Sequence, residues 1–385
     1  MRVLLGIHHP LDANLGAPGV TLALGRALAA LGCEVDYYSY QEAFPGVPWY
    51  GSWHGVRFPW KLAAHLAREA HRYDVLDITT GDAWAWARLG RPGARARHAL
   101  VTRSHGLEHV VSEQLHADAR EGRATLSWKY PLYHGGFRLW EVRQSLLLAD
   151  HAVLLNARDA AYSRERLGVP ASKLSVIPHG LDEVFLGLPP PRRVADSVSE
   201  RAPLRVAFVG SWIQRKGREE VVAVARELTA RGVPFRLSLY GTGLGVDEVL
   251  GSFPAAARER LTVVPRYVHT ELPRLLADDE VLLFPSHSEG FGMALVEAMA
   301  CGLAPVSSPV GVAPQVVRHG QTGCLIPVGD VSGLVGALCG FADQREQLQA
   351  LRQAAQHEVR NLTWRDIGAR TLSLYETLLG NQRKP

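Results

Sequence analysis

The 385-residue sequence contains few cysteines, and they are too scattered to hold a metal ion or to form a disulfide framework. They are Cys33, Cys301, Cys324 and Cys339, and no two of them have the two-residue separation of zinc and redox motifs. We therefore expect a reduced, cytoplasmic protein with no structural metal.

The chain also lacks long apolar runs and basic blocks. No stretch approaches the eighteen consecutive apolar residues of a membrane-spanning helix, and the apolar run at the amino terminus is too short for a signal peptide. The 42 Lys and Arg residues nearly balance the 38 Asp and Glu residues, which leaves a net charge of +4. These absences argue against a membrane-spanning protein and against nucleic acid as a partner.

Short apolar runs recur along the whole chain and alternate with helical patterns, which predicts an α/β fold with parallel sheets. The predicted strands are Arg2–Ile7, Cys33–Ser39, Val75–Thr79, Ala99–Arg103, His151–Leu155, Lys173–Ile177, Leu204–Val209, Phe235–Tyr240, Leu261–Val264, Val281–Phe284, Leu303–Ser307 and Gly323–Ile326. The predicted helices include Val20–Leu31, Lys61–Tyr73, Ala157–Leu167 and Trp364–Leu379, and we expect a loop from Phe44 to Trp60.

The length and the 47% hydrophobic content predict two globular domains. The Pro-rich, polar segment 187–202 is typical of a linker. We therefore expect an N-terminal domain at 1–186, a C-terminal domain at 203–363, and a final helix at 364–385.

Two carboxylates stand eight residues apart at the end of a predicted strand, with Glu289 in a loop and Glu297 in the helix that follows. Gly290 and Gly292 open that helix, and Gly302 lies where a left-handed cap is expected. The helical part of the separation spans roughly 8–10 Å, about the length of a diphosphate with a sugar at each end. Backbone N–H groups at the helix start favour a diphosphate, and carboxylates accept hydrogen bonds from sugar diols. The alternative is a solvated helix with two surface glutamates.

The motif S-E-G-F-G-x-x-x-x-E-A-M-A-C-G, with its Glu289-x7-Glu297 pair, resembles the signature of family 4 retaining glycosyltransferases. The resemblance implies the GT-B fold, in which two Rossmann-like domains face each other across a cleft. It also implies that the C-terminal helix crosses back onto the N-terminal domain. A nucleoside diphosphate sugar would be the donor substrate, with no metal ion and no further cofactor.

The resemblance assigns Glu297 to the ribose, Arg215 and Lys216 to the diphosphate, and Glu289 to the sugar. It places His105 beside the hydroxyls of the donor sugar, so the implied catalytic residues are His105, Glu289, Arg215 and Lys216. The implied donor-binding residues are Gly16, Gly19, Gly210, Arg215, Lys216, Gly241, Arg266, Tyr267, Glu289, Gly290, Phe291, Gly292 and Glu297. Ser211 stands where the family has an arginine, and we assign that charge to Arg215.

Two segments of the N-terminal half allow other interpretations. His105, Glu108 and His109 match the H-x-x-E-H pattern of zinc proteases, but Gly106 is a poor residue for the helix that this pattern needs. A mixed aromatic and cationic segment could contact a membrane surface, line an acceptor groove or pack internally, and it contains Trp128, Lys129, Tyr130, Arg138, Leu139, Trp140 and Arg143.

The sequence therefore predicts a retaining glycosyltransferase that moves a hexose from a UDP- or GDP-sugar to a glycan, lipid-linked or small-molecule acceptor. Its expected location is the cytoplasm, with peripheral contact at the inner face of the membrane through the N-terminal domain as an added alternative. A nucleotide-sugar epimerase of the same fold and a non-catalytic nucleotide-sugar-binding partner are the rival hypotheses. Ser211 and Gln315, which replace residues usual in the family, keep the non-catalytic hypothesis open.

Overall fold

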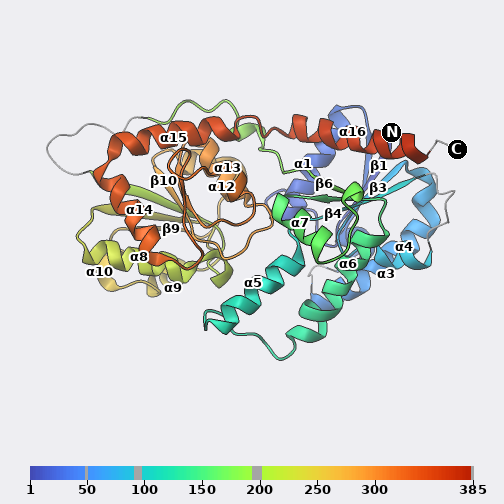
Figure 1. Ribbon diagram of the computed structural model, residues 1–385, viewed down its shortest axis with the longest axis horizontal. Coiled ribbons are helices and arrows are strands. Elements are labelled where there is room, and N and C mark those ends of the chain that lie inside the picture. Colours follow the sequence, from blue (N-terminus) through green and yellow to red (C-terminus); the bar gives the residue numbers. More distant parts are fainter. Residues whose placement is uncertain (48–50, 91–97, 193–201, 383–385) are drawn as a thin grey trace. The chain divides into compact units, whose positions relative to one another are not determined.

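The computed structural model describes residues 1–47, 51–90, 98–192 and 202–382. The chain forms two compact units, each built on its own sheet (Figure 1). The first contains Met1–Gly180 together with the segment that begins at Trp364, and the second contains Leu181–Thr363. Part of the predicted linker, 193–201, lies outside the described residues.

The first unit has a six-stranded parallel sheet in the order β2-β1-β3-β4-β5-β6. Its strands are β1 Arg2–Gly6, β2 Glu34–Tyr38, β3 Val75–Thr79, β4 Ala99–Arg103, β5 His151–Leu154 and β6 Leu174–Val176. Its α-helices are α1 Gly16–Ala30, α2 Tyr40–Ala43, α3 Ser52–Glu69, α4 Trp84–Leu89, α5 Glu108–Arg120, α6 Arg138–Leu148, α7 Ala157–Glu165 and α16 Trp364–Gln382.

The second unit has a parallel sheet of the same size in the order β12-β11-β10-β7-β8-β9. Its strands are β7 Leu204–Val209, β8 Phe235–Tyr240, β9 Leu261–Val264, β10 Val281–Phe284, β11 Ala304–Ser307 and β12 Cys324–Leu325. Its α-helices are α8 Arg218–Ala230, α9 Val246–Gly251, α10 Ala255–Arg258, α11 Leu272–Leu275, α12 Met293–Ala300, α13 Ala313–Val316, α14 Val331–Asp343 and α15 Arg345–Val359. The predicted α/β class with two parallel sheets is thus confirmed.

In each sheet the order of the strands reverses once, between β1 and β3 in the first and between β7 and β10 in the second. The loops that leave such neighbouring strands run to opposite faces, so a crevice opens at the carboxyl ends of the strands. The loops after β1 and β3, and after β7 and β10, are therefore where functional side chains are expected to gather.

Helix α1 begins at Gly16, four residues earlier than the sequence predicted. Gly16 and Gly19 therefore lie in the first helical turn and not in a loop. Pro18 sits in this turn, where a missing N–H removes no helical hydrogen bond. A side chain at Gly19 would press on the carbonyl oxygen of Ala13, so this glycine has a packing role.

The predicted loop from Phe44 to Trp60 is also partly wrong, because helix α3 begins at Ser52 and carries Pro59 inside it. Phe58, Leu62 and Leu66 from this helix are fully buried in the core beneath it. Burial of each such side chain is worth about 1.5–3 kcal/mol, which outweighs the roughly 3 kcal/mol that an internal proline costs. Burial of these apolar side chains therefore makes the segment helical, although the internal proline disfavours a helix.

Helix α16 packs on the first unit beside α1, as the family resemblance implies (Figure 1). It is held to the sheet by a buried polar cluster in which the Tyr375 hydroxyl donates to Asp77. The Arg103 guanidinium donates to the same carboxylate with a shortest distance of 2.6 Å. Burial and the charge of Asp77 raise the pKa of Tyr375 well above its ordinary value, so Tyr375 is a hydrogen-bond donor throughout the working pH range.

No helix in the described residues has the length and apolar character needed to cross a membrane.

We predict that Tyr375→Phe lowers the free energy of unfolding by about 1–3 kcal/mol, because it leaves a buried carboxylate short of one donor. Urea denaturation monitored by circular dichroism measures the loss. Tyr162→Phe is the matched control, since its hydroxyl bonds to Glu113 at the surface, and its cost should stay below about 0.5 kcal/mol. Equal stability of the two variants would show that the buried cluster does not anchor α16.

Candidate active site

The loops after β7 and β10 bring together the cations and the first carboxylate that the sequence singled out. Lys216 Nζ lies 2.7 Å from Glu289 Oε1, and Arg215 Nη1 lies 3.8 Å from Glu289 Oε2. The hydroxyl of Ser286 also donates to Glu289 Oε1, at 2.8 Å. The Glu289 side chain is only 6% exposed. Glu289 is therefore a fixed carboxylate with two cations on it.

A glycine allows this close approach. Gly217 follows the turn that carries both cations, and its φ of +80° belongs to the left-handed region. A side chain at Gly217 would clash with the carbonyl group of Pro285, which follows β10. The backbone of Arg215 then pairs with the second loop, accepting a hydrogen bond from the His287 N–H at 2.9 Å. The two loops are thus locked together by their backbones.

Arg215 also contacts the second loop through its side chain, whose Nη1 donates to the carbonyl oxygen of Ser288 at 2.9 Å. The side chain is 43% exposed, whereas that of Lys216 is 18% exposed. Arg215 is therefore the more exposed of the two cations, and Lys216 is half-buried beside Glu289. Ser211, where the family has an arginine, is exposed.

The second carboxylate is on the second turn of α12, as the sequence predicted, and it is buried. Glu297 Oε1 lies 2.8 Å from His269 Nε2, and the other ring nitrogen of His269 lies 3.5 Å from Asp182 Oδ2. The hydrogen bond to Glu297 raises the pKa of His269 above its ordinary value of 6.5. Burial and the charge of Glu297 raise the pKa of Tyr267.

Sequence reasoning missed His269. It lies in a short 3₁₀ turn, His269–Glu271, between β9 and α11, and it reaches Glu297 from 28 positions earlier in the chain. The one local feature that could have indicated a role for His269 is its place two residues after Tyr267, which the family resemblance assigns to the donor site. His269 orients the Glu297 carboxylate and leaves the second carboxylate oxygen for another partner.

Three of the predicted glycines of this unit, Gly210, Gly241 and Gly292, have positive φ values. Gly292 is the N-cap of α12 with φ +97°, so the helix proper begins at Met293 and not at Gly290 as predicted. Gly210 packs beside the Lys216 side chain, and Gly241 packs against the ring of Tyr267. The structure therefore brings the predicted donor residues of this unit around the ends of β7, β8, β9 and β10, with Arg266 exposed, and they are Gly210, Arg215, Lys216, Gly241, Arg266, Tyr267, Glu289, Gly290, Phe291, Gly292 and Glu297.

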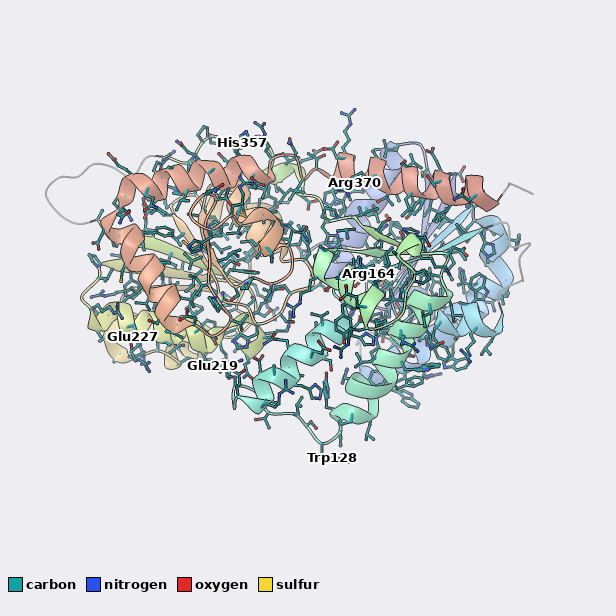
Figure 2. The ribbon with its side chains drawn as sticks, in the orientation of Figure 1. Trp128, Arg164, Glu219, Glu227, His357 and Arg370 are labelled. Atoms are coloured by element: carbon teal, nitrogen blue, oxygen red, sulfur yellow. The ribbon has the colours of Figure 1, made fainter. Side chains whose placement is uncertain are left out.

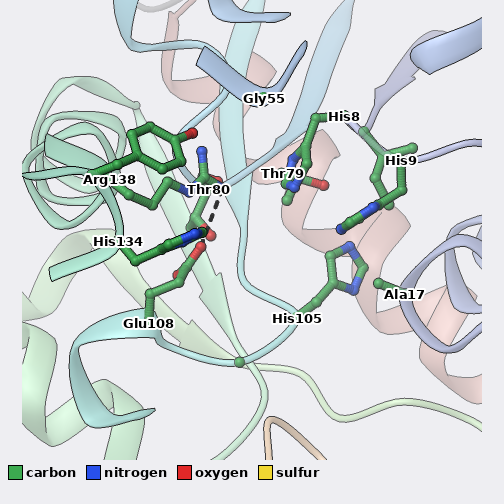
Figure 3. Close-up of a pocket in the computed structure, with 13 residues that line it drawn as sticks. His8, His9, Ala17, Gly55, Thr79, Thr80, His105, Glu108, His134 and Arg138 are labelled. Atoms are coloured by element: carbon green, nitrogen blue, oxygen red, sulfur yellow. Dashed lines mark hydrogen bonds and ion pairs between the residues drawn. The ribbon is translucent and has the colours of Figure 1, made fainter. Parts of the chain in front are cut away.

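The first unit holds a separate cavity of about 380 Å³ at the carboxyl ends of β1, β3 and β4 (Figure 3). His105 lines this cavity, and so does Ala17 from the first turn of α1, which also contains Gly16 and Gly19. The structure thus brings the predicted first-unit residues to one place.

His105 is a neutral group near pH 7. Burial, assisted by the charge of Arg103, lowers the pKa of His105 to about 3. Its Nδ1 is buried and meets no hydrogen-bond partner in the part of the chain that the structure describes. A neutral imidazole with an unused nitrogen is suited to a sugar hydroxyl, either as donor or as acceptor.

The zinc-protease pattern does not form its helix, because α5 begins at Glu108 and His105 lies before it. Within the described residues, no group of three or more His, Cys, Asp or Glu side chains is arranged to hold a metal ion.

The aromatic and cationic segment divides into two parts. Arg138 was predicted as a member of a mixed patch with three possible roles, but its side chain is buried and points into the cavity (Figure 3). Trp128, in contrast, is 78% exposed and lies in the connection between α5 and α6 (Figure 2). Of the three roles that the sequence left open for this segment, internal packing is the one that Arg138 adopts, because three carboxylates hold it inside the fold.

Comparison with known proteins assigns both halves of the chain. The family model described as "Glycosyl transferases group 1" matches residues 195–358, and the model "Glycosyltransferase Family 4" matches residues 16–185. A glycogen synthase from Mycobacterium tuberculosis (strain H37Rv) is 26% identical over 251 residues, which cover 64% of this chain and 58% of that protein. The chain thus matches little more than half the length of this curated relative. A D-inositol 3-phosphate glycosyltransferase from Streptomyces griseus is 25% identical over 421 residues, covering 98% of this chain and 88% of that protein.

Solved structures share the fold at low identity. Sucrose-phosphate synthase from Thermosynechococcus elongatus has a TM-score of 0.77 with 21% identity and covers 99% of both chains. Anabaena HepE in complex with UDP-glucose has a TM-score of 0.65 with 15% identity, covering 98% of this chain and 100% of that one. These neighbours support the GT-B fold. Because the two family models together extend over most of the sequence, this protein belongs to the group 1, family 4 glycosyltransferases.

Proposed function

We propose that the protein is a retaining glycosyltransferase that transfers a hexose from a UDP- or GDP-sugar to a glycan, lipid-linked or small-molecule acceptor. The observation that carries this proposal is the arrangement of Lys216 and Arg215 on Glu289 at the point where the second sheet reverses its strand order. Crevices of this kind bind nucleotides in open α/β sheets.

The two cations have the chemistry that the leaving group requires. When the bond from the anomeric carbon to the diphosphate breaks, negative charge grows on the diphosphate oxygens, and fixed positive groups stabilise that charge. Lys216, half-buried beside Glu289, and the more exposed Arg215 are the groups placed to do so. The proposal therefore includes no metal ion and no cofactor beyond the donor substrate.

Glu289 serves in this proposal as a ligand of the donor sugar and not as a nucleophile. Lys216, Arg215 and Ser286 already engage its two oxygens, which lowers their availability for covalent attack. The acceptor hydroxyl then attacks the anomeric carbon on the face that the diphosphate leaves, and its proton passes to the departing diphosphate oxygen. The configuration at the anomeric carbon is retained.

Glu297 has the position for the ribose of the donor. His269 occupies its Oε1 at 2.8 Å, and a ribose hydroxyl can donate to the remaining oxygen. Structures of Anabaena HepE contain UDP and UDP-glucose, which supports uridine as the first base to test.

Thermal unfolding with UDP, GDP, ADP and their sugars tests the proposal. A ligand at 100 times its dissociation constant stabilises the protein by about 2.7 kcal/mol, which raises Tm by a few degrees. We expect a rise with one base and a larger one with one of its sugars. No rise with any of them would contradict the proposal, and conversion of the donor without an acceptor would favour an epimerase.

We predict that Lys216→Ala and Glu297→Ala each weaken binding of the free nucleoside diphosphate by about 10- to 100-fold, the equivalent of one charge-assisted hydrogen bond. Glu289→Gln should spare the nucleotide and weaken only the intact sugar donor, because Glu289 is assigned to the sugar. Calorimetric titration measures both affinities. Glu219→Gln, an exposed position on α8 outside the crevice, is the control and should bind like the wild type. Equal loss of nucleotide binding in Glu289→Gln would refute the division of roles.

The pair of His269 and Glu297 predicts a specific dependence of stability on pH. Because folding raises the pKa of His269, protonation of this ring stabilises the folded state. This stabilisation is fully present at a pH below the ordinary pKa of 6.5. It is lost as the pH rises through the higher pKa of the folded state. The difference in Tm between wild type and His269→Gln should therefore shrink from pH 6 to pH 9. A difference that is constant across this range would show that the pair does not carry charge.

A further inference from the structure

The cavity of the first unit differs in its charge from the crevice of the second. It opens at the ends of β1 and β3, where the first sheet reverses its strand order, and its volume of about 380 Å³ is typical of sites for small molecules. A π-helical segment, Tyr133–Phe137, places Tyr133 and His134 in its wall, and such segments are frequent at functional sites. Nothing in the donor assignment uses these groups.

Among the described residues that line the cavity, Arg138 is the only Arg or Lys side chain. Its Nη2 donates to the carbonyl oxygen of Thr80 at 2.9 Å and to Glu108 Oε1 at 3.2 Å. Its Nη1 donates to the carbonyl oxygen of Gly81 at 3.2 Å and lies 3.5 Å from Asp82 Oδ1. A side chain at Gly81 would clash with the guanidinium, so the backbone there is shaped around it. Both terminal nitrogens are thus committed to the protein.

Carboxylates outnumber this single cation. Besides Asp82 and Glu108, Glu141 approaches Arg138 Nη1 at 3.7 Å, and the side chains of Asp82 and Glu141 are fully buried. Burial raises the pKa of Glu108 and brings that of Glu141 to about 7; Arg138 opposes the rise in both, and the charge of Asp82 adds a smaller rise. An anion entering the cavity would meet this excess at close range, in a poorly solvated place.

The groups that face the cavity are hydrogen-bonding groups with little positive charge. Glu108 Oε2 is buried and has no hydrogen-bond partner within the described chain, and the same holds for His105 Nδ1. Burial lowers the pKa of His9 to about 4, so this ring also is neutral near pH 7. Figure 3 shows Glu108, His134 and Arg138 on one side of the cavity and His8, His9 and His105 on the other. The unused Glu108 oxygen on one side and the neutral rings of His9 and His105 on the other suit a molecule with several hydroxyl groups (Figure 3).

We propose that this cavity takes a neutral, polyhydroxylated acceptor, a sugar or a polyol, and rejects the same compound once it carries a phosphate ester. Glu108 Oε2 accepts from a hydroxyl pair of this acceptor. The inference rests on the proposed function insofar as it calls this compound the acceptor. A preference for an uncharged acceptor would distinguish this chain from the D-inositol 3-phosphate glycosyltransferase and the sucrose-phosphate synthase, whose names contain a phosphorylated compound. Discrimination arises because a phosphate would lie beside these carboxylates, and Arg138, the cation among the described lining residues, is already bound to them.

The test compares matched probes that differ only by the phosphate: glucose with glucose 6-phosphate, fructose with fructose 6-phosphate, and myo-inositol with myo-inositol 3-phosphate. Ligand-observed NMR titration of the full chain, without nucleotide, gives the dissociation constants. We expect the neutral member of at least one pair to bind at least tenfold more tightly than its phosphate. Phosphates that bind as tightly as their neutral partners in every pair that binds would overturn the inference, and so would the absence of binding by all six probes.

Two variants identify the cause. Glu108→Gln removes one negative charge at constant shape, so it should weaken the neutral probe about tenfold and reduce the discrimination against phosphate. Glu113→Gln lies on the same helix, α5, outside the cavity lining, and should change neither quantity. Unchanged discrimination in Glu108→Gln would show that the charge of Glu108 is not responsible.

This experiment is independent of the donor crevice. If the nucleotide panel gives no thermal shift while the neutral probe still binds selectively, the proposed transferase function fails and the cavity assignment stands. If nucleotides bind while no probe shows the expected selectivity, the acceptor inference alone fails.

Discussion

The reversal of strand order in each parallel sheet is the constraint on which both candidate sites depend. At this point two neighbouring strands send their chains to opposite faces, so their carboxyl ends are left open to a ligand. In the second sheet the opening lies between β7 and β10, and the left-handed Gly217 lets the two loops close until Lys216 reaches Glu289. In the first sheet it lies between β1 and β3, and it holds the cavity with His105.

The two openings carry opposite chemistry. In the second unit two cations, Lys216 and Arg215, meet the carboxylate of Glu289, so an entering diphosphate finds positive charge. In the first unit three carboxylates surround Arg138, and the histidines with the lowest pKa values are neutral. Such a division suits the proposed reaction between an anionic donor and an uncharged acceptor, since the anionic donor is disfavoured beside the carboxylates of the first site. It also explains why both units bury polar groups at a cost in stability.

The strands and the carboxylate motif could be predicted from the sequence because their signals are local. Leu204–Val209 is apolar except for Arg205, Val281–Phe284 is apolar throughout, and the structure has both strands with those bounds. The contacts of the sites could not be predicted, because Arg138 meets Glu108 across 30 positions and His269 meets Glu297 across 28. The start of α3 was mistaken for a loop since burial of Phe58 overrides the proline signal.

Acceptor-dependent release of the nucleoside diphosphate tests the central claim most directly. The protein is incubated with UDP-glucose or GDP-mannose, with and without neutral sugars, and the released nucleotide and the anomeric protons of the product are followed by NMR. The account predicts release that depends on the acceptor and a product with the anomeric configuration of the donor. Inverted configuration would contradict retention, and a lack of turnover with any acceptor despite tight donor binding would contradict catalysis itself.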